Sequence, residues 1–179
     1  LFDYQYDKII ESLRWFHFYN LKNEKVKVVF VPSYLSGNDG IFNMAYWDLL
    51  IGMDISVFPS YYEPWGYTPL ESVAFSVPTI TTDLSGFGQW VKDHYNKKHG
   101  AAVVHRSDYN FSEVTDAITE ILAEFISLNN KKMDEVRNRA LETSKKALWE
   151  EFIQYYYEAY SIALINRDKR LKKTPENTS

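Results

Sequence analysis

The chain has 179 residues, enough for one α/β domain with a sizeable core, and 45% of them are hydrophobic, which argues against a disordered chain. A net charge of −4 without a long basic stripe argues against a nucleic-acid surface, and the absence of cysteine excludes disulfide and thiol chemistry. No apolar run approaches the ~20 residues that a membrane-spanning helix needs.

The first part of the chain predicts a helix, a strand and a second helix. Apolar residues three and four apart predict a helix over residues 6–20, with one apolar face. The β-branched run at residues 26–31 predicts a strand, and the pattern over residues 43–53 is helical again. Alternation of this kind favours an α/β fold.

A short strand and the turn after it form the most informative stretch of the sequence. Residues 55–58 predict a buried strand, and Pro, Trp and Gly in residues 59–66 predict a tight loop. A helix is then expected from Thr68 to about residue 75. Thr68 suits the N-cap, Pro69 the first helical position, and Glu71 lies three residues after the cap, as in a capping box.

This strand, loop and helix start predict a ligand site. In α/β sheets, ligands bind at the carboxyl ends of strands, and the N–H groups and dipole of a helix N-terminus suit a phosphate. The alternative is that the aromatic, Pro and Gly residues only pack a tight turn and that Glu71 only caps the helix. Two carboxylates and three aromatics around one helix start favour the site.

The rest of the chain repeats strand and helix, which predicts a Rossmann-like parallel sheet flanked by helices. A turn with Gly86 and Gly88 follows the strand at 77–82 and is expected at the same sheet edge as the loop containing Glu63. The other expected elements are a strand at 100–105 and helices at 87–96, 111–128, 131–143 and 144–168, the last with an apolar and aromatic stripe.

The string from Ser60 to Glu71, SYYEPWGYTPLE, resembles the signature of glycogen synthases of the animal and fungal type. These are retaining glycosyltransferases with two Rossmann domains, the GT-B fold. The resemblance implies that residues 1–168 form the C-terminal, nucleotide-sugar-binding half of such an enzyme, incomplete at its N-terminus, and that residues 169–179 are a polar tail. Leu1 in place of an initiator Met also suggests a piece of a longer protein.

The resemblance also implies roles for individual residues. Glu63 matches the catalytic glutamate beside the donor sugar, and Glu71 matches the glutamate that holds the ribose hydroxyls. Tyr46 falls where the family stacks a tyrosine on uracil, although it could also be an ordinary helix-surface aromatic. The loop around the sugar and diphosphate corresponds to Trp65, Gly66, Tyr67 and Thr68.

The partners that the resemblance implies are UDP-glucose as donor, an α-glucan acceptor and an N-terminal domain of the same protein, in a cytoplasmic enzyme. That domain and the preceding segment would supply the acceptor site and the phosphate-binding Arg and Lys. A homo-oligomer is left open, and no metal, cofactor, nucleic acid or membrane is expected. Without these parts we expect no catalysis by the 179 residues alone.

Three alternatives stay open at this point: a related transferase with another acceptor, a non-catalytic sugar-nucleotide-binding module and, less favoured, a hydrolase that uses both glutamates as an acid/base pair. The family also carries an arginine-rich helix that senses a sugar phosphate. In the matching residues 131–139 only Arg137 and Arg139 correspond, and Asp134 and Glu135 oppose a phosphate, so this control is not expected.

Overall fold

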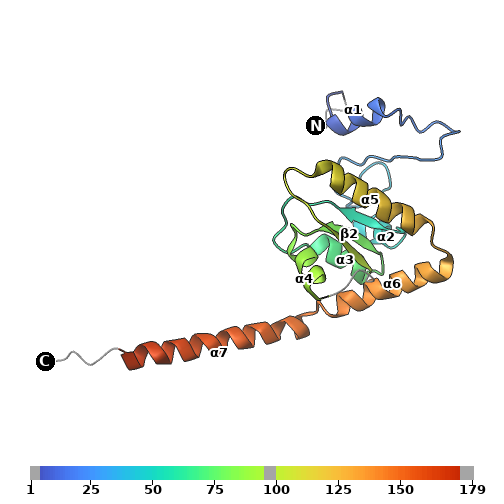
Figure 1. Ribbon diagram of the computed structural model, residues 1–179. Coiled ribbons are helices and arrows are strands. Elements are labelled where there is room, and N and C mark those ends of the chain that lie inside the picture. The colour runs from blue at the N-terminus through green and yellow to red at the C-terminus, as the bar shows by residue number, and fades with distance from the viewer. Residues whose placement is uncertain (1–4, 95–99, 174–179) are drawn as a thin grey trace. The chain divides into compact units, whose positions relative to one another are not determined.

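The computed structural model describes residues 5–94 and 100–173 (Figure 1). The chain divides into two compact units, residues 1–49 and residues 50–179. The predicted end of the helix at 87–96 and residues 174–179 of the predicted tail lie outside the described residues. None of the described helices is both long and apolar enough to cross a membrane.

A three-stranded parallel sheet forms the centre of the second unit. Its strands are β1 (Ser56–Phe58), β2 (Thr79–Thr82) and β3 (Ala101–Val104), in the order β1-β2-β3. Val57 lies opposite Ile80, and all three strands run in the same direction. The predicted α/β class with a parallel sheet is therefore confirmed.

Helices cover both faces of this sheet, as parallel strands require. Alternate residues of β3 point to opposite faces: Ala101 packs with α3 (Tyr67–Ala74), α4 (Gly86–His94) and α6 (Asn130–Lys145), whereas Val104 packs with α5 (Phe111–Ile126). Figure 1 shows α5 and α3 on opposite sides of β2. The apolar face predicted for the helix at 111–128 is confirmed as the α5 side of this core: Val114, Ala117, Ile118, Ile121 and Leu122.

The end of the chain differs from the prediction of one helix beginning at residue 144. Helix α6 continues to Lys145, and α7 (Trp149–Lys173) begins after a turn at residues 146–148. The side chains of Thr143 and Ser144 are buried, and their carbonyls accept the N–H groups of Lys146 and Ala147. The end of α6 thus stays docked on the unit, and the chain turns before α7 begins.

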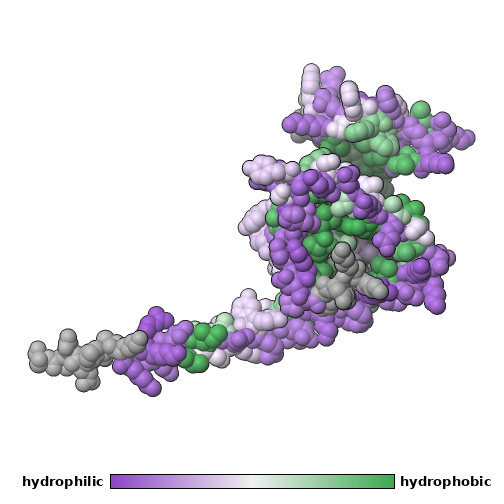
Figure 2. Space-filling model, viewed as in Figure 1, coloured by the Kyte–Doolittle hydropathy of each residue, from purple (hydrophilic) through white to green (hydrophobic). Residues whose placement is uncertain are grey.

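Most of α7 makes no buried contact. Phe152 is half-buried, but every residue from 154 to 172 is exposed, including Tyr160 at 59%. Figure 2 shows hydrophobic side chains on the surface of α7, and the exposed hydrophobic residues of this helix include Ile162, Leu164 and Ile165. The aromatic stripe predicted for this helix is thus present but uncovered.

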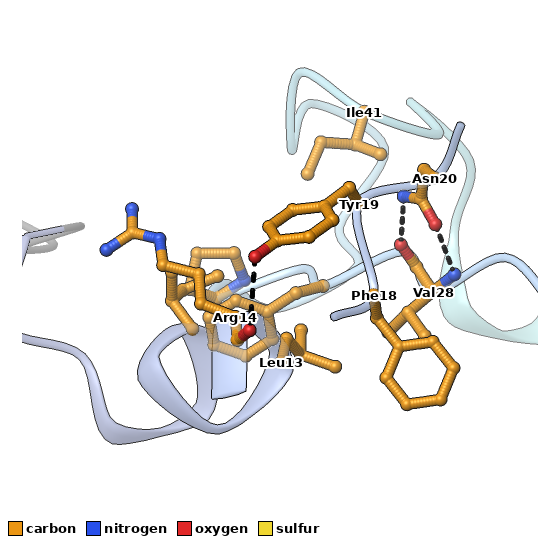
Figure 3. A pocket seen from close by; sticks show the side chains of 10 residues that line it. Leu13, Arg14, Phe18, Tyr19, Asn20, Val28 and Ile41 are labelled. Carbon is orange, nitrogen blue, oxygen red and sulfur yellow. Dashed lines mark hydrogen bonds between the residues drawn. The ribbon is translucent and has the colours of Figure 1, made fainter. Parts of the chain in front are cut away.

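The unit of residues 1–49 contains less regular structure than predicted. Helix α1 (Lys8–Trp15) starts at the N-cap Asp7 and ends before residue 20, because His17 has a left-handed φ of 59°. The predicted strand at 26–31 is absent. The side-chain amide of Asn20 bonds both the N–H and the C=O of Val28, at 2.8 and 2.7 Å, in the place of a neighbouring strand (Figure 3).

The second predicted helix, at 43–53, is also shorter in the structure. Asn43 has a positive φ of 51°, which delays the start of the helix, and α2 spans only Tyr46–Leu50. Asn43 instead helps to close a preceding turn, where the carboxylate of Asp39 accepts N–H groups from Ile41, Phe42 and Asn43.

Candidate functional site

Glu63 lies at the carboxyl edge of the sheet, between the turns that follow β1 and β2. Its N–H donates to the carbonyl of Leu84 at 3.2 Å, and its carbonyl accepts the N–H of Gly86 at 3.1 Å, which forms an isolated parallel bridge with Ser85. Its half-buried carboxylate accepts the hydroxyl of Ser60 at 3.1 Å. The expectation that both turns share one edge is confirmed.

Close contact between these two turns depends on glycine at position 86. A Cβ built there would lie 2.4 Å from the carbonyl oxygen of Pro64 and 3.1 Å from the Cα of Trp65, so any side chain would push the turns apart. The sequence indicates only a Gly-containing turn at this position, whereas the structure shows what Gly86 approaches.

Gly66 brings the start of α3 beside the Glu63 carboxylate. It is the N-cap of α3, with φ at 113°, a conformation that favours glycine. A Cβ built on Gly66 would lie 3.5 Å from the Cδ of Glu63. The carboxyl group of Glu63 therefore lies next to the N-terminal end of this helix.

The predicted capping box is wrong. Helix α3 begins at Tyr67, one residue before the predicted N-cap Thr68, and no side chain caps it. The positive φ of Gly66 sets the entry angle of the chain, so Thr68 and Pro69 already lie inside the helix and Glu71 falls beyond its first turn. Glu71 is thereby left available for a role other than capping.

The first turn of α3 offers backbone donors to an anion. The N–H groups of Tyr67 and Thr68 belong to the turn that has no intrahelical acceptors. Both residues are exposed, and the first turn carries no acidic residue that would compete with an anion. A phosphate at this point would meet the positive end of the helix dipole.

Glu71 is half-buried and unsatisfied. Among the described residues its carboxylate has no hydrogen-bond or ion-pair partner, and burial raises the pKa of this carboxyl above its ordinary value. Since a half-buried carboxylate without donors costs folding free energy, its presence is more easily explained by a ligand that supplies them.

Trp65 packs into the unit with its indole ring. The ring lies edge-on to Phe87 and Phe152, at centroid distances of 6.1 and 5.3 Å, and 6.2 Å from Trp90. Its carbonyl accepts the N–H of Phe87 at 2.5 Å. The structure thus gives the Trp65 side chain a packing role that orders the loop.

Tyr46 belongs to the other unit and begins α2. Its N–H donates to the carbonyl of Leu35 at 2.9 Å, and its half-buried ring lies 5.0 Å from that of Trp47 in an edge-on arrangement. The structure therefore describes Tyr46 within residues 1–49, and its role toward a base stays a prediction.

Two residues at the same sheet edge were not predicted as functional: Asp83 after β2 and Arg106 after β3. Asp83 is 6% exposed and accepts hydrogen bonds from His105, from Lys92 and from the backbone N–H of Arg106, at 2.8, 3.1 and 2.9 Å. Burial raises the pKa of Asp83, but these donors, led by the Arg106 N–H, outweigh it and hold the pKa below its ordinary value. Each of them directly follows a predicted strand, and this position at the carboxyl end of a strand is the sequence signal that could have identified them.

The remaining acidic and basic groups of interest lie away from this edge or are paired with one another. Among residues 5–94 and 100–173, no three His, Asp or Glu side chains are grouped so that they could hold a metal ion. The guanidinium of Arg137 bonds the carboxylate of Asp54 and the carbonyl of Met53, at 3.0 and 3.1 Å, and Arg139 pairs with Glu135 at 3.4 Å. Both family-matching arginines thus already have acceptors within the unit.

A pocket is also present within residues 1–49, between α1 and the segment after it (Figure 3). Its walls are mostly apolar, with the Tyr19 hydroxyl bonded to the carbonyl of Arg14 at 3.3 Å. No carboxylate lines it. None of the residues proposed for sugar-nucleotide chemistry lies in its walls, which include Ile10, Leu13, Phe18, Val28, Phe30 and Ile41.

The fold is that of an α/β domain with a parallel sheet flanked by helices, and its candidate site lies at the carboxyl ends of the strands. Comparison with known proteins identifies the family. The glycogen synthase family model matches residues 1–177. "Glycogen [starch] synthase isoform 1" of Saccharomyces cerevisiae is 33% identical over 162 residues, which cover 88% of this chain and 23% of the yeast protein.

Animal proteins match to the same degree. "Glycogen [starch] synthase" of Caenorhabditis elegans and "Glycogen [starch] synthase, liver" of Mus musculus are each 32% identical over 160 residues, covering 88% of this chain and 24% and 23% of the relatives. The chain therefore belongs to the glycogen synthase family. It spans about a quarter of the length of these curated relatives.

Proposed function

We propose that this chain is part of the C-terminal, sugar-nucleotide-binding half of a cytoplasmic glycogen synthase with the GT-B fold. The complete protein would transfer glucose from UDP-glucose to the non-reducing end of an α-1,4-glucan, with retention at the anomeric carbon. Family membership supports the glucosyl transfer, and the share of about a quarter of its relatives' length supports a partial enzyme.

The observation that carries the proposal is the contact between the Glu63 carboxyl and the N-terminal end of α3. In the transfer, the bond from the anomeric carbon to the diphosphate breaks with its electron pair on the leaving group. The acceptor oxygen forms the new bond to that carbon, and its proton passes to the departing diphosphate. The N–H groups of Tyr67 and Thr68 are suited to the diphosphate. Glu63, 3.5 Å from the built Cβ of Gly66, is suited to the hydroxyls and developing positive charge of the sugar.

The unsatisfied carboxylate of Glu71 supports the same arrangement of the donor. We assign it to the ribose hydroxyls, which would supply the hydrogen bonds that it lacks among the described residues. Tyr46 is assigned to the base by stacking. In this assignment Trp65 and Gly66 shape the loop, the first by packing and the second by its backbone conformation.

The alternative functions predict different activities. A transferase with another acceptor would use the same donor but not extend glycogen, and a non-catalytic module would bind the donor without transferring glucose. The hydrolase alternative requires Glu71 to act as an acid or base on the sugar rather than as a ligand for ribose.

The test uses the intact protein that contains this chain, with UDP-glucose or ADP-glucose as donor and glycogen or maltose as acceptor. We expect transfer from UDP-glucose to glycogen, and Glu63→Gln should lower kcat by roughly 10³-fold, as the loss of a group acting on the transition state does. Glu120→Gln, an exposed glutamate on α5, is the matched control and should leave kcat unchanged. Full activity of Glu63→Gln would refute the proposed role of Glu63. Glucan synthesis by the 179 residues alone would refute the proposal that this chain is only part of the enzyme.

A further inference from the structure

Arg106 connects the two outer strands of the sheet at the edge where Glu63 lies. It follows β3, yet its Nη1 donates to the carbonyl of Pro59, after β1, at 3.0 Å and 47 residues away in sequence. Its guanidinium carbon lies 3.5 Å from the centroid of the Tyr61 ring. One side chain thus contacts both ends of the segment 59–61, which leads directly into Glu63.

The same segment is held from β2 and in turn holds the Glu63 carboxylate. The carbonyl of Ser60 accepts the hydroxyl of Thr82 at 2.7 Å, and the hydroxyl of Ser60 donates to Glu63 at 3.1 Å. Arg106 therefore holds the carbonyl that precedes Ser60, and Thr82 holds the carbonyl of Ser60 itself. The hydroxyl of Ser60 in turn orients the Glu63 carboxylate. A shift of residues 59–61 would move the Ser60 hydroxyl and with it Glu63.

The backbone of Arg106 is held in place by a hydrogen bond of its own, separate from the side-chain contacts with Pro59 and Tyr61. Its backbone N–H donates to Asp83 at 2.9 Å, and the Asp83 carboxylate is held in addition by His105 and Lys92. The carboxylate thus anchors the backbone of Arg106, while the guanidinium extends to Pro59 and Tyr61.

Stability alone does not account for an arginine at this position. Arg106 is 6% exposed, its buried Nε has no hydrogen-bond partner in the described part of the chain, and none of the described ion pairs includes its guanidinium. Burying a charge with so few partners costs free energy, and replacing such a group by an apolar one of similar size is often neutral or stabilising. What arginine provides is a planar group that donates to a carbonyl while it stacks on a ring.

We infer that Arg106 is a positioning residue for glucosyl transfer, which holds the Glu63 loop in its productive geometry through Pro59 and Tyr61. This inference rests on the proposed function, since it takes Glu63 as the group that acts on the donor sugar. Arg106 acts through the loop and contacts no reacting atom.

The test compares Arg106→Met with Arg167→Met in the intact enzyme. Arg106→Met keeps the apolar part of the side chain but removes the donor and the stacked plane, whereas Arg167 is exposed on α7 and serves as the control. We expect Arg106→Met to keep or raise the melting temperature and to lower kcat by roughly 10- to 100-fold, as misplacement of a catalytic group does. The KM for the donor should change less, because α3 and Glu71 still bind it.

Tyr61→Leu is the second variant, because a buried position such as 106 tolerates fewer changes than the 55% exposed Tyr61. It should also lower kcat, and adding Arg106→Met to it should cost less than the product of the two single effects, since both act through one loop. Normal kcat in folded Arg106→Met or Tyr61→Leu, or a loss confined to KM, would overturn the inference. Failure of the proposed function would appear in the unmodified enzyme as an absence of transfer, and the inference would fall with it.

Discussion

The carboxyl edge of the sheet and the unit of residues 1–49 are both rich in aromatic side chains, but they use them in opposite ways. At the sheet edge Trp65 packs against Phe87, Trp90 and Phe152, and the turns around it are joined by backbone bonds. In residues 5–49 only Ile10 is buried. Figure 2 shows hydrophobic side chains on the surface of this unit.

This difference shows that an apolar sequence pattern identifies a face that can be buried, but does not show that another part of the same unit covers it. The first region packs because its strands and helices lie within the described chain and cover one another. The second has an amphipathic α1, with Ile9 and Phe16 exposed at 52% and 68%, and nothing in its own unit covers them. The following predictions test this contrast from the largest expected effect to the smallest.

Gly88→Ala should have the largest effect on stability. A Cβ at Gly88 would lie 2.0 Å from the carbonyl oxygen of Thr82, a backbone atom that holds β2, so the turn must shift. We expect a loss of about 3 kcal/mol in the free energy of unfolding, measured by urea denaturation of the 179-residue chain.

The control for Gly88→Ala comes from the other region. Gly37 has φ at 94° but no neighbour within 4 Å of a built Cβ, so Gly37→Ala carries only the backbone cost, about 1 kcal/mol. Equal losses for the two variants would mean that the sheet edge is no more tightly packed than residues 1–49.

Glu71→Gln should weaken donor binding while it stabilises the free protein. The amide loses charge-assisted bonds to ribose hydroxyls, worth about 2 kcal/mol, which corresponds to a roughly 30-fold higher Kd for UDP-glucose by calorimetry on the intact enzyme. Because burial raises the folded pKa of Glu71, the ionised carboxylate opposes folding above its ordinary pKa and this penalty disappears at lower pH. The stability gain should therefore appear at pH 7 and vanish below about pH 4.

Unchanged affinity of Glu71→Gln for UDP-glucose would show that the Glu71 carboxylate does not bind the donor. Thr68→Val, one turn earlier on α3, separates side-chain from backbone binding. We assign only the backbone N–H of Thr68 to the diphosphate. The Kd of Thr68→Val for UDP-glucose should therefore stay within about twofold of the parent value, a difference of roughly 0.4 kcal/mol in binding free energy.

Sequence reasoning identified the sheet edge correctly because buried parallel strands and the turns after them leave strong local signals. It placed β1, β2 and β3 and brought the Glu63 and Gly86 turns together. It failed at residues 26–31, since β propensity describes a residue's fit to a sheet and not the presence of a neighbouring strand.

Two other features were missed for different reasons: the true start of α3 and the contacts that Arg106, after β3, makes with the segment after β1. The capping pattern at Thr68 was overridden by the positive φ of Gly66, which no side-chain pattern reveals. Arg106 was not predicted because its contacts with Pro59 and Tyr61 depend on the order of the strands, and the chain separates them by more than forty residues. Distant pairing of this kind appears only when the sheet is assembled.

Asp83→Asn should have a moderate effect that depends on pH. The lowered folded pKa means that the carboxylate stabilises the fold above its ordinary pKa near 4, and that this contribution is lost as pH falls through the folded value. Because Lys92 and His105 are largely exposed, we expect a loss of only about 1 kcal/mol at pH 7.

The unfolding free energies of Asp83→Asn and the parent should converge as the pH falls below about 4, measured by urea denaturation at each pH. Asp116→Asn, an exposed position on α5, should show no such convergence. A constant difference between Asp83→Asn and the parent at every pH would mean that packing, not charge, holds this turn.

Trp15→Ala should have the smallest effect on the 179-residue chain and gives the sharpest test of the contrast between the regions. Trp15 is the last residue of α1 and is 79% exposed, so its loss should change the free energy of unfolding by no more than about 0.5 kcal/mol. In the longer enzyme proposed above, a domain that covers α1 would bury the indole, and the same substitution should then cost more than about 1 kcal/mol. Urea denaturation of both proteins measures the two values. If the cost stays small in both, the apolar face of α1 has no partner in the longer chain, and the exposure of this region is a property of the unit itself.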